Sequence, residues 1–324
     1  MKEKITDNGH VYKCLAPTNL AALLIEGSTI HKFSCNLKKL KKFMDMKLDY
    51  IFIDEVSMLH SNFYKILMVI KKLKQCKLII SGDFNQLDVI NDVQKYDYKS
   101  TYIIKELCDN NNLQLTKCRR SDDKLFNMIQ FENIPNLTQD SFNNKDTDVN
   151  ICWTNAKRKE INEKYMNAAW KKAKTKNHIK LDKLPYDENS QDVTLVNKTP
   201  LIGKVNNSKL GIINNERFTV KKVDTYSKEL TLENVREVVK KDEDGNVKKD
   251  KDGNVEMEKK IKTIVIGSDD FQKLFRIGYA FTTHSSQGMS IDKPYTIHEF
   301  NRMSKKLKYV VLSRSTKHEY INIM

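Results

Sequence analysis

A short apolar run that ends in two adjacent carboxylates constrains the fold of this chain more than any other stretch. Residues Tyr50 to Ile53 are followed at once by Asp54 and Glu55. Four apolar or aromatic residues predict a buried parallel strand, whose carboxyl end lies at the sheet edge where ligands bind in open α/β folds. In a site that hydrolyses a nucleotide, the first acid would hold Mg²⁺ and the second would accept a proton from the attacking water. An ordinary solvated strand end can have the same local sequence, so only the rest of the chain can distinguish a nucleotide site from such a strand end.

Alternating strand and helix patterns around this run predict an α/β domain with a parallel sheet. A strand is expected from Val11 to Leu15, followed by a helix from Asn19 to Glu26. Gly27 should end that helix, because glycine tolerates the left-handed conformation. Apolar residues recur at helical spacing between Leu59 and Leu73, and a further buried strand runs from Leu78 to Ser81.

The sequence changes character after a polar stretch rich in Asn and Asp, from Thr138 to Asp148, which predicts a linker. A strand from Val149 to Trp153 then precedes an amphipathic helix. Short strands follow, and a doubled Asp-Gly-Asn-Val after residue 243 predicts the turns of a charged β-ribbon. Near the end we expect a strand from Tyr279 to Thr283, a turn, and a closing strand from Lys308 to Ser313.

The composition favours a polyanionic partner. The chain has 57 Lys and Arg against 42 Asp and Glu, a formal charge of +15, which makes nucleic acid the leading candidate. Lysines are spread over the whole chain, so charge alone leaves the question open. The six cysteines form no C-x-x-C pair, as expected of reduced thiols. With no apolar run long enough for a membrane span and no signal peptide, we expect no membrane partner and a soluble, intracellular protein of the cytoplasm, nucleus or a viral replication site.

Six stretches, spread over nearly the whole chain, carry the functional signal. They are Leu15-Ala16-Pro17-Thr18-Asn19 with Gly27-Ser28-Thr29-Ile30-His31; Asp54-Glu55-Val56-Ser57-Met58; Gly82-Asp83-Phe84-Asn85-Gln86-Leu87; Leu115-Thr116-Lys117-Cys118-Arg119-Arg120; Ala280 to Gly288; and Tyr309-Val310-Val311-Leu312-Ser313-Arg314-Ser315. In this order they resemble the motifs of the superfamily 1 DNA helicases, in particular the RecD-like, 5′-to-3′ branch.

The resemblance implies an α/β fold with two RecA-like parallel-sheet P-loop NTPase domains, which bind ATP between them and single-stranded DNA across their tops. Residues 1–140 would form the first domain, truncated before its phosphate-loop strand, and residues 141–185 plus 262–324 the second. Residues 186–261 would form an inserted small β domain with a charged β-ribbon. Its segment from Pro200 to Glu216 looks like the small β-barrel of this branch.

The resemblance also implies roles at an ATP site. Asp54 is similar to the Mg²⁺ ligand and Glu55 to the residue that activates water. Gln86 is similar to the γ-phosphate sensor. Arg120 and Arg314 are similar to arginines that neutralise charge on the transferring phosphoryl group, a task for a permanently charged, planar donor. The remaining expected nucleotide contacts are Asp83, Gln287 and Gly288.

For nucleic acid, the resemblance implies contacts to the backbone of single-stranded DNA from both domains, through hydroxyls, backbone amides and helix N-termini. The expected first-domain contacts are Pro17, Thr18, Asn19, Thr29 and His31. The expected second-domain contacts are Thr282, His284 and Ser286, in a stretch that couples DNA to the ATP site.

One motif of the family is missing. No G-x-x-x-x-G-K-[ST] occurs in the sequence, and the 14 residues before Leu15 are too few for the strand, loop and helix of a phosphate loop. Without that loop, no cradle of backbone N–H groups holds the phosphates, so we do not expect hydrolysis by this chain alone. We therefore expect either a helicase completed by a separate polypeptide that carries the loop, or a catalytically inactive remnant that binds single-stranded DNA.

Overall fold

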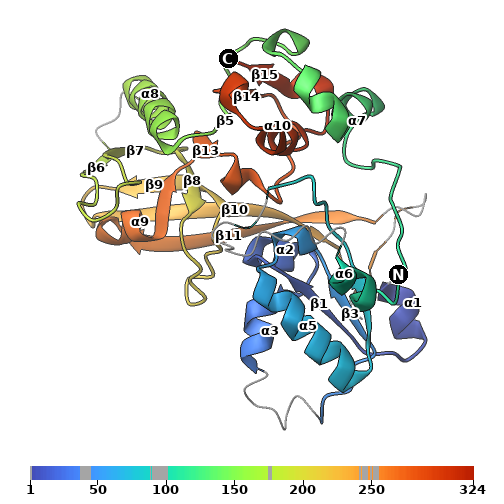
Figure 1. Cartoon of the computed structure of the whole chain (residues 1–324). Helices are drawn as coiled ribbons and strands as arrows, with labels where there is room; N and C mark the ends of the chain where they lie inside the picture. Colours follow the sequence, from blue (N-terminus) through green and yellow to red (C-terminus); the bar gives the residue numbers. More distant parts are fainter. Residues whose placement is uncertain are drawn as a thin grey trace. The chain divides into compact units, whose positions relative to one another are not determined.

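The computed structural model of the chain describes residues 2–36, 45–87, 89, 101–173, 177–240, 242, 247–248, 250 and 255–324 (Figure 1). These residues form two compact units, Met1–Thr147 with Thr283–Met324 and Asp148–Thr282. The first boundary falls at the end of the polar stretch 138–148. The division into three domains expected from the sequence stays a prediction.

A parallel four-stranded sheet, in the order β2-β1-β3-β4, is the framework of the first unit. Its strands and the elements between and after them are β1 (Tyr12–Ala16), α2 (Asn19–Leu24), β2 (Ser28–Thr29), α3 (Ile30–Asn36), β3 (Tyr50–Ile53), the 3₁₀ turn η1 (Val56–Met58), α5 (Ser61–Lys74), β4 (Lys77–Ile80), α6 (Tyr102–Leu107) and α7 (Asp123–Met128). Helix α1 (Lys2–Asp7) precedes the sheet, and the 3₁₀ turns η2 (Phe131–Asn136) and η3 (Gln139–Ser141) follow α7. The predicted strands and the predicted helix between Leu59 and Leu73 are confirmed.

The apolar residues that suggested strands and helices form the core of this sheet. Leu15, Ile51 and Ile53 of the strands are almost fully buried against α3 and α5, and Figure 1 shows both helices on the same face of the sheet. From α5, Leu67 and Ile70 enter this core at helical spacing. Along β3 the fully buried Ile51 and Ile53 alternate with the half-buried Tyr50 and Phe52, so the face toward these helices is the more deeply buried one.

Gly27 does not end helix α2 in the expected way. Glu26 takes the left-handed conformation, with φ 51°, while Gly27 packs against strand β1. A Cβ atom on Gly27 would lie 2.4 Å from the carbonyl oxygen of Cys14. The glycine is needed for this close approach of two backbones, and the turn itself is made by the glutamate.

The C-terminal part of the first unit contains η4 (His284–Ser286), β14 (Tyr295–Ile297), η5 (Phe300–Arg302), α10 (Lys305–Leu312), η6 (His318–Tyr320) and β15 (Ile321–Ile323), with β14 and β15 paired in parallel. The strand predicted from Lys308 to Ser313 is therefore wrong, because this segment is the second half of helix α10. Its run of β-branched and aromatic residues suggested a strand. Ser304 caps the helix by accepting from the Leu307 N–H, and Leu307 and Val311 share its buried face at helical spacing.

The second unit combines a parallel strand pair with an antiparallel sheet. Its elements are β5 (Asn150–Cys152), α8 (Asn155–Ala173), β6 (Ile179–Leu181), β7 (Val193–Leu195), β8 (Pro200–Gly203), β9 (Arg217–Asp224), β10 (Glu229–Val239), β11 (Met257–Gly267), α9 (Ser268–Leu274), β12 (Phe275–Ile277) and β13 (Ala280–Thr282). Strand β13 pairs in parallel with β5, and β6 pairs with β7. The antiparallel sheet has the order β11-β10-β9-β8-β12.

The long pair β10 and β11 corresponds to the predicted β-ribbon, with a register from Glu229 opposite Gly267 to Val239 opposite Met257. Most of the doubled Asp-Gly-Asn-Val lies outside the described residues. The inner face of the sheet supplies the core of this unit through residues such as Phe218, Leu230 and Ile264. Closure of this sheet into a small barrel stays a prediction.

Candidate functional site

The two predicted catalytic carboxylates lie at the carboxyl edge of the first sheet. Strand β3 places Asp54 directly after Ile53, where the Asp54 N–H donates to the Leu15 carbonyl at 3.0 Å. The Ser81 hydroxyl, just past β4, donates to Asp54 Oδ1 at 2.7 Å. Glu55 then takes the left-handed conformation, with φ 52°, and the chain turns into η1. A non-glycine residue held in this conformation stores backbone strain, which is concentrated at functional sites in proteins.

Four further charges surround Glu55. Burial raises the pKa of Glu55 above its ordinary value, and the charge of Asp54 raises it further. The charges of Arg314 and Arg120 lower this pKa, and that of Asp83 raises it. Arg314 lies 259 positions after Glu55 in the sequence, yet its charge acts on the same carboxyl group as that of the adjacent Asp54. The structure thus brings together five of the residues expected at the nucleotide site.

Asp83 and Gln86 occupy the turn after β4. Gly82 lets this turn approach η1, since a Cβ atom there would lie 2.7 Å from Val56 Cγ1. The Asp83 carboxylate accepts from the Asn85 N–H at 2.9 Å and from the Tyr309 hydroxyl at 2.7 Å. The Asp83 carbonyl accepts from the Gln86 N–H at 3.1 Å. The side chain of Asp83 is therefore committed to protein contacts, which favours a positioning role over a direct nucleotide contact.

Arg314 is a buried cation, with 1% of its surface exposed. Its guanidinium donates to the carbonyls of Val310, at 3.0 Å, and Met289, at 3.3 Å, and to the Ser313 hydroxyl at 3.0 Å. Within the described ranges no carboxylate lies within 4.0 Å of it. Burial, followed by the charge of Arg120, lowers its pKa to about 10. A buried guanidinium without a carboxylate partner is costly, and an anionic ligand would offset that cost.

Arg120 lies on an exposed turn that is tied to the segment after Arg314. The Asp122 N–H donates to the Thr316 carbonyl at 3.0 Å, and the His318 N–H donates to Asp122 Oδ2 at 2.8 Å. Asp122 also caps α7 through the Leu125 N–H. These bonds hold the two arginine-bearing segments together.

Three buried polar atoms within the helicase-like motifs have no hydrogen-bond partner in the described part of the chain: Gln86 Oε1, Gln287 Nε2 and Ser57 Oγ. Such atoms are rare in folded proteins and call for a water, ion or ligand. Gln287 follows η4 and precedes Gly288, whose φ is 77°. The unpaired amides at two expected nucleotide contacts fit a site whose ligand carries both donors and acceptors.

Sequence reasoning missed Ser57, Ser81 and Tyr309 as site residues. Ser57 and Tyr309 stand within the motifs that carried the helicase resemblance, and Ser81 directly follows a strand, so their places could have been noticed. Their contacts could not have been predicted, because the hydrogen-bond partners and the burial of these side chains depend on the fold.

The expected DNA contacts of the first unit gather at the same sheet edge. Strands β1 and β2 pair with Ala16 opposite Thr29, so the residues that follow them, Pro17 to Asn19 and Ile30 to His31, lie side by side. Thr18 caps α2 by accepting from the Ala21 N–H at 3.1 Å, and Thr29 accepts from the Lys32 N–H at 3.2 Å. Thr18, Asn19 and His31 are exposed.

The remaining expected DNA contacts fall in different environments. Thr282 is the last residue of β13, in the second unit. His284 begins η4 in the first unit, and partial burial lowers its pKa. Ser286 is fully buried, and its hydroxyl donates to the Thr283 carbonyl at 2.7 Å. Ser286 thus stabilises the turn itself, and His284 is the more accessible of the two.

Among the described residues, no group of three or more His, Cys, Asp or Glu side chains is arranged to hold a metal ion. Asp54, with the Ser81 hydroxyl beside it, offers oxygen ligands of the kind that Mg²⁺ takes together with substrate phosphates. Within the described ranges, none of the helices combines the length and apolarity that crossing a membrane requires.

No protein-family model and no curated protein sequence matches the chain. Solved structures do match it. A Bacteroides Pif1 bound to ssDNA has a TM-score of 0.63 and 19% identity, over 99% of this chain and 84% of its own. The Pif1 helicase from Candida albicans has a TM-score of 0.61 and 17% identity, over 100% of this chain and 86% of its own. A Bacteroides Pif1 helicase in complex with ADP-AlF3 and ssDNA has a TM-score of 0.57 and 19% identity, over 96% and 82%.

This likeness concerns the fold. It shows that the chain has the mixed α/β fold with parallel sheets of a helicase with two RecA-like domains, as the sequence motifs predicted.

Proposed function

We propose that this chain is the larger part of an ATP-dependent DNA helicase of superfamily 1, in the RecD-like, 5′-to-3′ branch. It would couple ATP hydrolysis to movement along single-stranded DNA and to unwinding. The observation that carries the proposal is that the charges of Asp54, Asp83, Arg120 and Arg314 all act on Glu55, at the carboxyl edge of the first sheet. The fold shared with Pif1 helicases, some of them solved with ssDNA or ADP-AlF3, supports it.

The proposed nucleotide is ATP with Mg²⁺. Asp54 would hold the ion, which neutralises charge on the transferring phosphoryl group, and Glu55 would accept a proton from the attacking water. The pKa of Glu55 is raised, which brings it closer to neutral pH, where a general base works best. Arg314 and Arg120 would stabilise the phosphoryl oxygens. The unpaired amides of Gln86 and Gln287 would complete the contacts, with Gly288 beside them.

A separate polypeptide would supply the phosphate loop. In the described part of the chain, β4 is an edge strand that pairs with β3 alone. Leu113 and Leu115 alternate along an extended segment that leads to Arg120, and their side chains are 84% and 83% exposed. Figure 1 shows this segment as a trace between α6 and α7. The free edge of β4 and the two exposed leucines lie in the same unit. A strand from the second polypeptide could pair with that edge and cover the leucines, and the phosphate loop after that strand would then reach Asp54 and Glu55.

Reconstitution tests this function. A polypeptide with an apolar strand and a G-x-x-x-x-G-K-[ST] loop is added to the chain, and ATP hydrolysis is measured with and without single-stranded DNA. We expect DNA-stimulated hydrolysis that falls by about a thousandfold in Arg314→Ala and is lost in Glu55→Gln. The control variant Glu163→Gln changes an exposed glutamate of α8 and should keep full activity. Full activity in Glu55→Gln or Arg314→Ala would refute the assigned roles.

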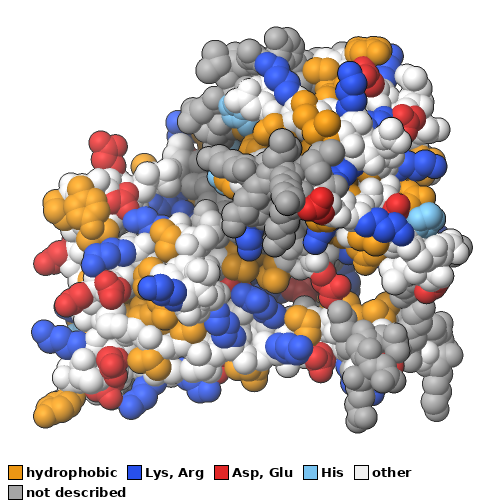
Figure 2. Space-filling model, turned by 90° about the horizontal axis from the view of Figure 1, so that it is seen from below, with side chains coloured by type: hydrophobic (Ala, Val, Ile, Leu, Met, Phe, Trp, Pro, Cys, Tyr) orange, Lys and Arg blue, Asp and Glu red, His pale blue; other side chains and the backbone are white. Residues whose placement is uncertain are grey.

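Single-stranded DNA is the proposed nucleic-acid partner, bound through Pro17, Thr18, Asn19, Thr29, His31, Thr282 and His284, with Ser286 shaping the turn. Figure 2 shows Lys and Arg side chains interspersed with acidic and apolar ones on one face of the molecule. Local contacts from strand ends and helix N-termini, added to the net charge of +15, therefore carry the proposed binding.

The second candidate function is a catalytically inactive remnant that keeps the DNA-binding edge. The formal charge of +15 and the exposed residues Thr18, Asn19 and His31 after β1 and β2 favour it. It predicts single-strand binding that weakens with salt and does not respond to ATP. An ATP-dependent change in DNA affinity of the isolated chain would exclude this alternative.

A further inference from the structure

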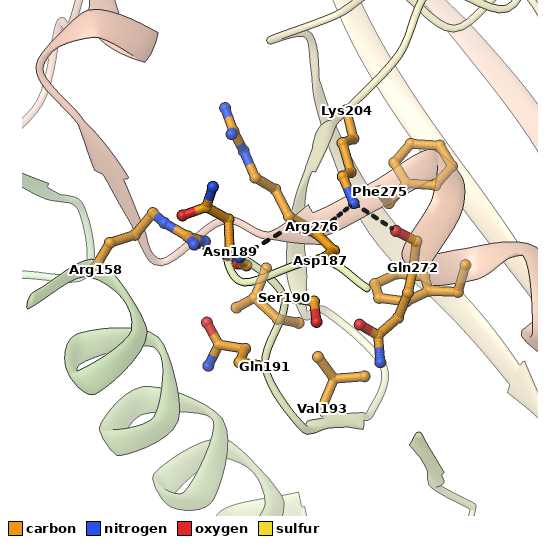
Figure 3. Close-up of a pocket in the computed structure, with 12 residues that line it drawn as sticks. Arg158, Asp187, Asn189, Ser190, Gln191, Val193, Lys204, Gln272, Phe275 and Arg276 are labelled. Carbon is orange, nitrogen blue, oxygen red and sulfur yellow. Dashed lines mark hydrogen bonds and ion pairs between the residues drawn. The ribbon is translucent and has the colours of Figure 1, made fainter. Parts of the chain in front are cut away.

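The antiparallel sheet of the second unit ends in two edge strands, and the longer of them is β11, with 11 residues. The other edge, β12, is covered from within the chain. Asn162 of α8 donates to the Ile277 carbonyl at 3.4 Å. The loop 187–191 and Arg158 line a small cavity together with Arg276 of β12, as Figure 3 shows. In the described part of the chain, β11 pairs with β10 alone, so the backbone groups on its outer side are open to a further strand.

Next to this open edge, β11 presents a row of apolar side chains to solvent. Because successive side chains along a strand point to opposite faces, Met257, Ile261 and Val265 share the outer face of the sheet. Val235 of β10 lies directly opposite Ile261 and adds to the row. All four side chains are more than half exposed, whereas Ile264, on the other face of β11, is buried in the core. Apolar side chains gathered in this way mark an interaction surface.

The charge of β11 favours an acidic partner. The strand carries Lys259, Lys260 and Lys262 but one acid, Glu258, which leaves a net charge of +2. Lys260 Nζ lies 3.5 Å from Glu258 Oε1, and the Lys260 side chain is 69% exposed, so this ion pair contributes little. An acidic strand is therefore the complementary one at this edge.

A second copy of the chain is disfavoured there. When two β11 strands pair antiparallel about a twofold axis, a register centred on Ile261 sets Lys260 opposite Lys262 of the second copy. Registers centred on Lys260 or on Lys262 set two copies of the same lysine opposite each other. Like charges directly opposite each other destabilise a sheet, and edge lysines protect proteins from such pairing.

Nucleic acid is also a poorer match than protein. Proteins hold single strands by stacking the bases on aromatic side chains, in addition to attracting the phosphates. The sequence of β11 contains no aromatic residue, and the apolar part of its exposed face consists of Met257, Ile261 and Val265. Lysines alone would attract phosphates, but the apolar row would stay in water.

We propose that β11 binds an extended acidic segment of a partner protein, which adds to the five-stranded sheet as a further strand. The backbone of the segment pairs with the outer N–H and C=O groups of β11. Its apolar side chains cover Met257 and Ile261, and its carboxylates, which alternate with the apolar residues, reach Lys260 on the other face. The surface lies outside the proposed ATP-binding and DNA-binding residues and does not rest on the helicase proposal.

An eight-residue peptide of alternating valine and glutamate is the probe, with the full chain as its target. Fluorescence anisotropy of the labelled peptide measures the affinity, and amide hydrogen exchange locates the bound strand. At roughly ten times the dissociation constant, about a tenth of the chain stays free of peptide. We therefore expect the fast-exchanging amides of β11 to slow by about tenfold, with those of β12 unchanged.

Two control peptides separate strand addition from charge attraction. Proline in place of one central valine removes a backbone N–H and interrupts the pairing, so the affinity should fall by at least about tenfold. Lysine in place of every glutamate should abolish binding. Equal affinity for either control peptide, or no slowing of β11 exchange at about 1 mM peptide, overturns the proposal.

Two variants of the chain test the assigned residues. Lys260→Glu reverses a charge and should weaken binding of the valine–glutamate peptide by at least about tenfold. Ile261→Ser removes the centre of the apolar row, and we expect a loss of about three- to tenfold. The controls Lys172→Glu on α8 and Val69→Ser on α5 change exposed side chains elsewhere and should keep the affinity. Unchanged affinity in Lys260→Glu, or in an Ile261→Ser chain that melts cooperatively, overturns the proposal.

Other occupants of this edge give different outcomes. An oligothymidylate that slows β11 exchange and displaces the peptide would assign the edge to nucleic acid. Exchange of β11 that slows as the concentration of the chain itself rises, without peptide, would assign it to a second copy. Either result overturns the proposal.

Discussion

The Tyr309 hydroxyl donates a hydrogen bond of 2.7 Å to Asp83 Oδ2, although the two residues lie 226 positions apart. Asp83 belongs to the turn after β4, and Tyr309 lies on α10, five residues before Arg314. Burial, and then the bond to Asp83, raises the pKa of Tyr309, so the hydroxyl stays a donor at neutral pH. This bond joins the sheet edge that carries the carboxylates to the segment that carries the buried arginine.

A double-mutant cycle on this pair should show coupling. Tyr309→Phe removes the donor to a charged acceptor, so we expect the free energy of unfolding to fall by about 1.5–3 kcal/mol. With Asp83→Asn in the background, the same change should cost less, by about 1 kcal/mol. Urea unfolding measures all four chains. Tyr226→Phe, at a tyrosine that is 99% exposed, is the control and should change stability by less than about 0.5 kcal/mol. Additive effects of the two site variants would show that the bond contributes nothing.

The sequence correctly predicted those elements whose apolar residues, as spaced in the sequence, are the ones buried in the fold. Tyr50 to Ile53 is apolar on both faces, and such a run can satisfy both faces within a parallel sheet. The carboxylates after it were placed correctly at the sheet edge, since the end of a strand fixes the position of the next residue. In the same way, the spacing of Leu67 and Ile70 was enough to identify helix α5.

The sequence failed where a local preference was overruled by packing. Val310 and Val311 favour a strand, but burial of one face and the Ser304 cap make α10 a helix. Glu26 replaced Gly27 in the left-handed position, because the glycine was needed against Cys14. The burial of Arg314 and the bond from Tyr309 to Asp83 depend on segments far apart in the chain, and no local pattern encodes such contacts.

Glu55→Gln should stabilise the chain at neutral pH. The pKa of Glu55 is raised in the folded state, so between the unfolded and folded values the native chain binds more protons. Stability therefore falls as pH rises through the folded pKa, and the penalty is fully present above it. The variant cannot ionise there, so its melting temperature should exceed that of the unmodified chain at pH 7.

The same comparison at lower pH isolates the cause. The two melting temperatures should converge as pH falls below about 4, where both the folded and the unfolded glutamate are protonated. Glu163→Gln, an exposed glutamate on α8, should show no such gain at any pH. A Glu55→Gln chain that is less stable than the unmodified chain at pH 7 would contradict the burial of an ionised Glu55.

Gly27→Ala should destabilise the first sheet. The new methyl group would lie 2.4 Å from the Cys14 carbonyl oxygen and 2.8 Å from the carbonyl carbon, so β1 or the turn has to move. We expect a loss of about 1–3 kcal/mol in urea unfolding, the usual cost of overpacking. Gly267→Ala is the matched control, because a Cβ atom there meets nothing within 4 Å. Equal effects of the two changes would show that the close approach to Cys14 is unimportant.

Replacing both exposed leucines, Leu113→Ser with Leu115→Ser, should separate folding from assembly. Both side chains are already in water in this chain, so the free energy of unfolding should change by less than about 0.5 kcal/mol. Binding of the polypeptide that carries the phosphate loop should weaken by at least tenfold, because two leucines lose their burial in the complex. Tyr186→Ser, at another exposed apolar side chain, is the control and should leave this affinity unchanged. Retained affinity in the double variant would exclude the segment from the proposed interface.

Single-stranded DNA binding should depend on the edge where β1 and β2 end. His31 is exposed at that edge, directly after β2, whereas His10 is exposed before β1, at the opposite end of the strands. We expect His31→Ala to weaken the binding of an oligothymidylate roughly three- to tenfold, the loss of one hydrogen bond. His10→Ala should leave the affinity unchanged. Fluorescence anisotropy at several salt concentrations measures both, and affinity should fall as salt rises because cations contact the phosphates. Equal losses of DNA affinity in the two variants would show that the DNA does not follow the carboxyl edge of the sheet. That result would also refute the proposed path past Thr18 and Asn19.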